Sequence, residues 1–517
     1  MIHMCPDITQ NDSFRLPANL PASLQRVNRH EWLSTAQRLR QAGAELVTLW
    51  GADDRSRDGC FQMYAAYLTA DEVFVVRHAL EPTNLTYPDL AGLFPAARRM
   101  ERAVYDLLGI AAYPRDERSW LRHGGWPETV FPLRKDVDAQ RTFPLVSAAY
   151  PFVTVAGDGV HEIPVGPVHA GTIEPGHFRF SVVGEKVLRL EERLGYTHKG
   201  VAKRFEQLSQ HEGHRLAARL SGDTAAAFSW AYCTALESIT HVTCPARAVA
   251  LRALALELER VANHLGDLGA IGNDGGFAFG LTQFSRLKED LLRANAAAFG
   301  ARYLLDYIVP GGVAVDVSVS AQRLLLEQCK TLQQVIPMLR TIYDDHAGLQ
   351  DRLRETGRLE HAIAVELGAT GVAARASGIA RDLRVNYPWP PYSQLKPSAA
   401  VQSSGDVFAR VQVRFDEALE SLRLCSALLQ ELPPEPIQTV VPAAEADCLG
   451  VGLIESWRGP VLIALETGAQ GSIRRCHAHD SSWQNWPLLE YAIMGNIVPD
   501  FPLINKSFNL SYSGHDG

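Results

Sequence analysis

Residues 251–268 read LRALALELERVANHLGDL, and apolar residues recur in this stretch at i, i+3, i+4 and i+7. This spacing predicts a long amphipathic helix with one face toward a protein core. The glycine cluster Gly272–Gly276 is expected to break the helix. The pattern stays mostly helical from Gly200 to about Leu429, so the centre of the chain is predicted to be a helical core.

The residues before this core mix helical and strand patterns. Helical spacing near Glu31–Gly43 is followed by strand-like segments at Ala44–Leu49 and Val73–His78. A helix is expected over about Leu90–Leu108, ending at Gly109, because glycine is common just after a helix. The sequence FRFSVVGEKVLRL alternates in the manner of a half-buried hairpin.

The predicted fold class is α+β, with an α/β domain followed by a mainly helical core and a small β-rich region. The length of 517 residues also suggests more than one domain. The expected boundaries are a flexible N-terminus at 1–19, the α/β domain at 20–145, a linker at 146–164 and the larger domain at 165–517.

The composition is that of a soluble globular protein, with 46% hydrophobic and 21% charged residues. The net charge of −8 comes without a compensating basic block, which argues against nucleic acid as a partner. The start of the chain has no secretory pattern, and no window approaches about 18 consecutive apolar residues. We therefore expect a chain that is soluble by itself and reaches a membrane only through partners.

The eight cysteines are scattered, and none forms a C-x-x-C pair. This excludes the usual zinc, haem and iron–sulfur signatures and favours buried or free thiols in a reducing cytoplasm. The sequence Cys476-His477-Ala478-His479 has C-x-x-H spacing and could supply two metal ligands. A metal site needs three or four ligands, so a structural role is expected here.

Two parts of the chain resemble two subunits of one family of complexes. ERAVYDLLGI at 101–110, followed by PLRKD at 132–136, is similar to the signature of the small hydrophilic subunit of complex I. The chain from about 165 to its end resembles the quinone-pocket subunit of complex I and the large subunit of group 4 NiFe-hydrogenases. The matching pieces are GPVH at 166–169, GYTHKG at 195–200, ERVANH at 259–264, PGGV at 310–313, RASGI at 375–379 and GLIES at 452–456. The ending NIVPDFPLINKS at 496–507 leans toward the hydrogenase branch, and the fusion resembles formate-hydrogenlyase-type subunits.

One departure from the hydrogenase pattern decides the chemistry. The resemblance implies two C-x-x-C pairs that hold nickel and iron. Counted from the matching motifs, those positions carry Ser221, Thr224, Ser511 and Gly514. Hydroxyls do not replace soft thiolates, and glycine offers no ligand, so we expect no NiFe centre and no cofactor bound by this chain.

The resemblance also implies candidates for proton handling or for lining the cavity. Glu174 matches a carboxylate that starts proton transfer in hydrogenases, although it could be a turn acid bonded to backbone amides. Arg219 matches an arginine that overlies the metal in hydrogenases. Alternatively, it pairs with a carboxylate such as Asp223, which is itself a candidate. His169 lies in the loop that faces quinone in complex I. In complex I a tyrosine works with this histidine, and no tyrosine is present near Asp223 here. Quinone therefore remains a possible ligand, but its reduction in the complex I manner is not expected. Further polar candidates are His177, His198 and the pair His515-Asp516.

The implied function is that of a subunit in a membrane-bound respiratory-type oxidoreductase complex without a NiFe centre. It would couple electron transfer at a 4Fe-4S cluster in a small iron–sulfur partner to proton or ion translocation by antiporter-like membrane subunits. The implied location is the cytoplasmic face of the inner membrane. The alternative is a non-catalytic scaffold that assembles or links the modules. A hydrogenase with unrecognised ligands is nearly excluded by the replaced cysteines.

Overall fold

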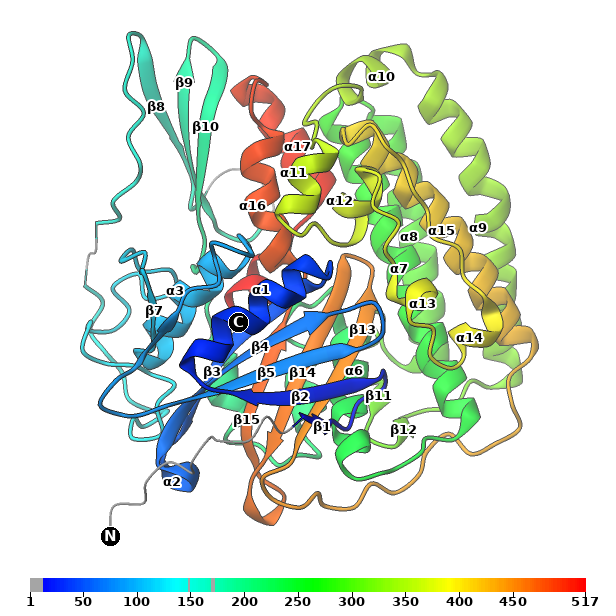
Figure 1. The fold of residues 1–517 in the computed structure, drawn as a ribbon. Coiled ribbons are helices and arrows are strands. Elements are labelled where there is room, and N and C mark those ends of the chain that lie inside the picture. The colour runs from blue at the N-terminus through cyan, green and yellow to red at the C-terminus, as the bar shows by residue number, and fades with distance from the viewer. Residues whose placement is uncertain (1–12, 147–148, 169–172) are drawn as a thin grey trace.

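The chain begins with a five-stranded mixed sheet (Figure 1), seen in a computed structural model that describes residues 13–146, 149–168 and 173–517. The strand order is β1-β2-β5-β4-β3, with β2 parallel to β5 and the other neighbours antiparallel. The strands are β1 Ser13–Arg15, β2 Ala22–Val27, β3 Glu45–Asp54, β4 Cys60–Leu68 and β5 Val73–Leu80. The predicted strand at 44–49 overlaps β3 from Glu45 onward, and the predicted strand at 73–78 lies within β5. Residues 13–19 differ from the expected flexible tail, because β1 pairs with β2 and Asn19 bonds Leu453.

The two long helices of this domain begin and end where local chemistry dictates. Helix α1, Arg29–Gln41, starts at a capping box in which Asn28 and Glu31 bond each other's backbone N–H groups. Helix α3, Ala97–Leu108, ends at Gly109 with φ of 73°, which confirms the predicted C-cap. It starts later than expected, because the residue before Pro95 is disfavoured in helical geometry. The short elements here are α2 Arg55–Asp58, β6 Thr86–Pro88 and β7 Ala111–Tyr113.

The predicted hairpin is present and carries a third strand. Strands β9 His177–Val183 and β10 Lys186–Arg193 pair antiparallel, and β8 Val160–Val165 adds to the edge of β9. The expected linker at 146–164 therefore ends inside a strand. Figure 1 shows this sheet projecting from one side of the molecule.

The centre of the chain is the predicted helical core, built around the long helix α7, Ala246–Asp274. Helices α8 Ala278–Phe299 and α15 Val407–Gln430 pack along it, and α9 Val319–Asp345 packs against both of those helices. The other helices of this region are α4 Val201–Phe205, α5 Gly213–Ala217, α6 Ala225–Ile239, α10 Ala347–Leu353, α11 His361–Glu366, α12 Gly371–Ala376, α13 Leu383–Asn386 and α14 Tyr392–Leu395. A short hairpin joins β11 Ile308–Val309 to β12 Gly312–Val313.

The charged face of α7 is buried rather than solvated, which differs from the amphipathic prediction. Glu257 is fully buried and accepts hydrogen bonds from Arg384 (2.8 Å), Tyr392 (2.7 Å) and Ser421 (2.6 Å). Further along the helix, His264 contacts Glu417 at 2.8 Å. Buried charges are tolerated only when paired, and α7 meets this condition through its neighbours.

A three-stranded antiparallel sheet lies between the helical core and the N-terminal sheet (Figure 1). Its strands are β13 Leu449–Ser456, β14 Gly459–Thr467 and β15 Ile473–His479, and α6 covers β13 and β14. On β15, His477 stacks on Trp50 of β3, with ring centroids 4.9 Å apart, and bonds Thr48 at 2.8 Å. The N-terminal sheet is therefore attached to the core through specific side chains.

The chain ends in three helices, α16 Ser482–Ala492, α17 Phe501–Phe508 and α18 Tyr512–Asp516, with short 3-10 turns at Ala469–Gly471 and Val498–Asp500. The mixture of helices and several small sheets confirms the predicted α+β class. Among the described residues, no helix combines the length and apolar character needed to cross a bilayer.

Candidate functional site

The structure brings together positions at which the resemblance predicts the hydrogenase cysteines. The hydroxyl oxygens of Ser221 and Ser511 lie 2.9 Å apart, although 290 residues separate them. Ser511 precedes α18 and accepts a hydrogen bond from the backbone N–H of Gly514 at 2.9 Å. Thr224 precedes α6 and donates to Asp223 at 3.1 Å. Two segments from opposite ends of the large domain therefore form one small polar site.

An internal ion pair crosses this site. Arg458, at the turn between β13 and β14, donates two hydrogen bonds to the two carboxylate oxygens of Asp223, at 2.8 and 2.5 Å. It also donates to the hydroxyl of Thr224 at 3.1 Å and to the carbonyl of Asn509 at 2.6 Å. This bidentate geometry is the strong form of an arginine–carboxylate contact. The Arg458 guanidinium therefore lies against the hydroxyl of Thr224 and against the carboxylate to which Ser221 and Thr224 donate.

The protonation of Asp223 follows from these neighbours. Burial alone would raise the pKa of the Asp223 carboxyl. The Arg458 guanidinium and the hydroxyls of Ser221 and Thr224 outweigh burial and hold that pKa at about 2. Asp223 is thus a carboxylate at neutral pH, fully engaged by its partners.

The fourth position is closed by a second carboxyl. A β-carbon added to Gly514 would lie 2.6 Å from Oδ2 of Asp480 and 2.8 Å from the Ser511 hydroxyl. Asp480 is buried, and its Oδ1 accepts the backbone N–H of Ser482 at 2.8 Å. Burial raises the pKa of this carboxyl. A cysteine at 514 would require Asp480 to move, so the space of the missing side chain is already taken.

The residues present do not fit a nickel–iron centre. Such a centre needs soft thiolates that bind and bridge two metals, whereas the site offers hydroxyls, a glycine and an ion pair. Among the described residues, no group of three or more His, Cys, Asp or Glu side chains could hold a metal ion. The C-x-x-H motif of β15 does not supply two ligands to one metal. Cys476 and His479 are three residues apart on β15, so their side chains point to opposite faces of the sheet.

Glu174 and Asp223 lie at this site, and Glu174 reaches it from outside. Glu174 is exposed, and its carboxylate accepts the backbone N–H of Ser513 at 3.0 Å. Ser513 lies between the replaced positions Ser511 and Gly514. The bond to a backbone amide is one of the two expectations for Glu174, and it places this carboxylate beside Ser511 and Gly514.

Arg219 is not part of the site. Its guanidinium makes two hydrogen bonds to Asp306, at 2.6 and 2.8 Å, and both side chains are exposed. The expected partner Asp223 is instead bound by Arg458, because the turn after α5 directs Arg219 outward. His169 lies outside the described residues.

Sequence reasoning missed Arg458, Asp480 and Asn509. In the sequence, Arg458-Gly459 marks only the turn of a hairpin, and Asp480 is only the residue after His479. A buried carboxylate such as Asp223 needs a cation beside it. Because Arg219 does not supply that cation, this need could have pointed to another arginine such as Arg458. Asn509 donates to Asp267 of α7 at 2.6 Å, which ties the end of the chain to the helical core.

Comparison with known proteins gives two family matches in one chain. Residues 25–143 match the 30 kDa subunit and residues 274–448 the 49 kDa subunit of respiratory-chain NADH dehydrogenase. Formate hydrogenlyase subunit 5 of Escherichia coli (strain K12) is 32% identical over 494 residues, covering 92% of this chain and 85% of that protein. Hydrogenase-4 component G of the same organism is 31% identical, covering 91% and 83%.

More distant similarities agree with this assignment. The carbon monoxide-induced hydrogenase of Rhodospirillum rubrum is 30% identical over 358 residues, covering 68% of this chain and 97% of that protein. A chain in the structure of the archaeal membrane-bound sulfane sulfur reductase has a TM-score of 0.66 at 23% identity, covering 70% of this chain and all of that one. That likeness concerns the fold. Both resemblances drawn from the sequence motifs are confirmed, and the chain belongs to the family of formate hydrogenlyase subunit 5 and hydrogenase-4 component G, in which a 30 kDa-type and a 49 kDa-type complex I domain are fused.

Proposed function

We propose that this chain is the large subunit of a membrane-bound respiratory-type oxidoreductase complex that works without a NiFe centre. The observation that carries the proposal is the ion pair of Asp223 and Arg458 beside Ser221, Thr224 and Ser511, which replaces the thiolate cradle of hydrogenases. The fold and family are retained, while the donor set has changed from soft sulfur to hard oxygen. The subunit would therefore serve electron transfer in its complex by a route other than hydrogen chemistry.

The names of the relatives support a place among other subunits. Formate hydrogenlyase subunit 5, hydrogenase-4 component G and a membrane-bound hydrogenase subunit alpha are each named as parts of larger assemblies. The proposed partners are a small iron–sulfur subunit with a 4Fe-4S cluster near Ser221 and Ser511 and antiporter-like membrane subunits. The proposed location is the cytoplasmic face of the inner membrane.

The proposed role of the site is proton handling. Glu174 is exposed and contacts the backbone between the replaced positions, while Asp480 is a buried carboxyl with a raised pKa on their other side. Carboxyls with different environments can pass a proton between them when water or hydroxyls connect them. Electron transfer at the partner cluster would change the affinity of these groups for protons. Quinone is one candidate acceptor, with His169 as a further candidate contact.

The test uses the purified membrane complex that contains the full chain. Elemental analysis is expected to find iron from the partner cluster and no stoichiometric nickel. Electron transfer to quinones and to other acceptors is then measured for wild type, Glu174→Gln and His169→Ala. The matched control is Glu327→Gln, which changes an exposed carboxylate on α9, away from the site. A rate lowered by Glu174→Gln and unchanged by the control supports the proposal, and one nickel per complex contradicts it.

A second function, a scaffold without turnover, is favoured by one observation. Both Asp223 oxygens accept hydrogen bonds from Arg458, and the Ser221 and Thr224 hydroxyls also donate to Oδ1, so this carboxylate is held in a structural ion pair. Under this alternative, the complex shows no electron transfer to any acceptor although its clusters are intact. Removing the chain would then dissociate the peripheral module from the membrane module.

A further inference from the structure

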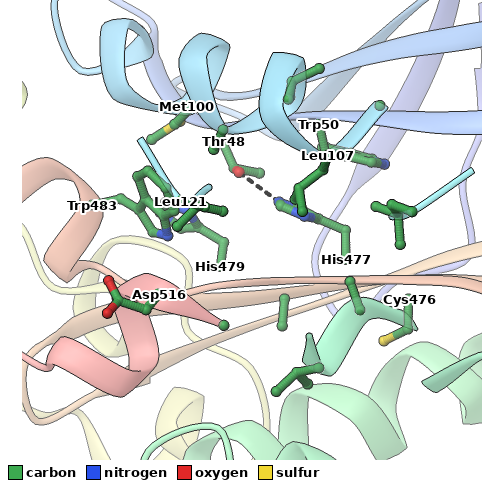
Figure 2. Close-up of a pocket in the computed structure, with 18 of the residues that line it drawn as sticks. Thr48, Trp50, Met100, Leu107, Leu121, Cys476, His477, His479, Trp483 and Asp516 are labelled. Carbon is green, nitrogen blue, oxygen red and sulfur yellow. Dashed lines mark hydrogen bonds between the residues drawn. The ribbon is translucent and has the colours of Figure 1, made fainter. Parts of the chain in front are cut away.

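Two cavities of the described chain differ in size. The interior cavity in Figure 2 has a volume of about 90 Å³, and its lining includes Met100, Leu107 and His477, whose ring contacts Thr48 at 2.8 Å. The second cavity is an open groove between α6, the start of α7, α14 and the end of α15, with a volume of about 720 Å³. Of the two, only the groove falls within the roughly 300–1,000 Å³ of small-molecule sites.

The walls of the groove are mainly apolar and are fixed by aromatic packing. Val242, Val249 and Leu395 line it. Trp230 of α6 and Trp389 also line it, and their rings meet edge to face with centroids 6.0 Å apart. Because these two tryptophans are 3% and 6% exposed, they form a rigid wall. An apolar part of a ligand is therefore stabilised in the groove by its removal from water.

One face of α6 presents unused polar groups to the groove. Trp230, Thr234 and Ser238 follow one another at intervals of four residues, and all three line the groove. Residues at this spacing lie on the same side of a helix, with Cβ atoms roughly 5–6 Å apart. Among the described residues, the Trp230 indole N–H and the Thr234 and Ser238 hydroxyls have no hydrogen-bond partner, and none of these atoms is sealed from solvent. Trp230 and Thr234 are more than nine-tenths buried, so the groove is the space that their polar atoms reach.

These groups can be satisfied by a hydrogen-bond acceptor on a ligand. An indole N–H only donates, and a hydroxyl can donate as well as accept. A carbonyl oxygen has two lone pairs, so one such oxygen can accept from both Trp230 and Thr234. Polar groups in a poorly solvated site cost free energy while they have no partner, which favours a ligand that supplies the acceptor.

The charges around the groove disfavour an anion. Glu237 of α6 accepts hydrogen bonds from both terminal nitrogens of Arg252, at 2.9 and 2.6 Å, so these two charges balance. Glu431 and Glu435 are exposed, line the groove and form no ion pair within the described part of the chain. The unbalanced charge is therefore negative and lies at the exposed edge, where it attracts a cation and repels carboxylates and phosphates.

We propose that this groove binds a small organic molecule that combines a neutral carbonyl oxygen, an apolar chain and a protonated amine. The carbonyl oxygen accepts hydrogen bonds from Trp230 and Thr234. The chain lies along the apolar wall, and the ammonium group faces Glu431 and Glu435. Amino amides have this combination of groups, whereas fatty acids and phosphate esters carry the wrong charge for it.

Saturation-transfer NMR titrations of the full-length chain test the proposal with three probes of similar length. 6-Aminohexanamide carries both polar groups, hexylamine lacks the carbonyl, and hexanamide lacks the amine. 6-Aminohexanamide is expected to bind roughly two- to tenfold more tightly than hexylamine, the range that one net hydrogen bond supplies. It is expected to bind up to about fivefold more tightly than hexanamide, and added salt is expected to reduce this second difference. Equal binding of the three probes, or no binding of 6-aminohexanamide, overturns the proposal.

Three variants locate the binding. Thr234→Val keeps the shape of the side chain and removes its hydroxyl, so the advantage of 6-aminohexanamide over hexylamine is expected to fall. Glu431→Gln removes one charge at the exposed edge and is expected to reduce the advantage over hexanamide. Ala427→Phe adds bulk at a half-buried lining position and is expected to exclude all three probes. Glu327→Gln removes an exposed charge on α9, outside the groove, and is the control that is expected to bind the probes as wild type does.

The variants and the wild-type comparison together decide the outcome. Affinities that none of the three groove variants changes would place the binding elsewhere and overturn the proposal. If a variant fails to fold, the remaining variants and the comparison of the three probes on wild type still test it. The measurement needs no partner subunit and no electron transfer, so its failure leaves the proposed function standing.

Discussion

The hydroxyl oxygens of Ser221 and Ser511 lie 2.9 Å apart at the point where the two ends of the large domain meet. In the hydrogenase pattern these positions hold a metal between two thiolates, whereas here two hydroxyls contact each other directly. Asp223 and Arg458 complete the site with opposite charges. These four residues therefore have bonds of their own, and placing cysteines at the predicted ligand positions is not expected to create a metal site.

The fourfold variant Ser221→Cys, Thr224→Cys, Ser511→Cys and Gly514→Cys tests this expectation. We expect no stoichiometric nickel, because Arg458 still occupies the site and the new side chain at 514 meets Asp480 at 2.6 Å. Overpacking there is expected to cost about 1–3 kcal/mol of unfolding free energy. Elemental analysis and urea denaturation measure both effects. Ser221→Cys alone is the control and is expected to fold normally, and nickel retained by the fourfold variant would refute the account.

The ion pair itself is predicted to stabilise the site. Arg458→Met removes the guanidinium and leaves Asp223 without its cation, which is expected to lower the unfolding free energy by roughly 2 kcal/mol. This is below the roughly 3–5 kcal/mol of a fully buried pair, because solvent reaches part of Asp223. A double-mutant cycle with Asp223→Asn measures the coupling. If the two substitutions lower the unfolding free energy additively, the interaction between Asp223 and Arg458 contributes no stability.

His477 is predicted to hold the N-terminal sheet to the core. His477→Ala removes the stacking on Trp50 and the bond to Thr48, and it is expected to cost about 2 kcal/mol. Limited proteolysis is expected to release the N-terminal domain faster than in wild type. His161→Ala, at an exposed position on β8, serves as the control. If release is equally fast in both variants, His477 does not hold the domain.

The sequence predicted the fold class because α7 and the hairpin of β9 and β10 have strong periodicities. It did not predict that the charged face of α7 would be buried. Glu257 and His264 have the spacing of a solvated face, and only the arrival of Arg384 and Glu417 from distant segments pairs them. Pairing over more than 100 residues leaves no local trace in a single sequence.

The candidate site shows the same limit. Glu174 and Asp223 were found because they lie within or near matching motifs, and both have contacts in the segments that meet at Ser221 and Ser511. Arg219 also lies in a motif, but the turn after α5 directs it toward Asp306. Arg458 was missed because its role depends on a contact with a residue 235 positions away. Motif position predicts the neighbourhood of a side chain, whereas its direction depends on the tertiary structure.

Glu259 gives a prediction with a defined pH range. It is buried on α7 and accepts the backbone N–H groups of Ala226 and Ala227, at 2.7 and 3.3 Å. Burial raises the pKa of Glu259 to about 8 against the lowering effect of these two bonds, and the negative charge of Asp223 adds to the rise. Around neutral pH the folded chain therefore holds this proton, while the unfolded chain has released it.

The sign of the effect follows from this difference. Below the ordinary carboxyl pKa of about 4.5, both states hold the proton and Glu259 costs no stability. As the pH rises from about 4.5 toward 8, the unfolded state ionises first, so stability is lost over this range and the loss stops above pH 8.

Glu259→Gln, which cannot ionise, is expected to be more stable than wild type by up to about 3 kcal/mol at pH 7 and nearly equal to it at pH 4. Urea denaturation at pH 4, 6 and 8 measures the gap, with Glu327→Gln as the exposed control. A gap that stays constant across these pH values would mean that Glu259 is ionised in the folded chain and that its two amide bonds outweigh burial.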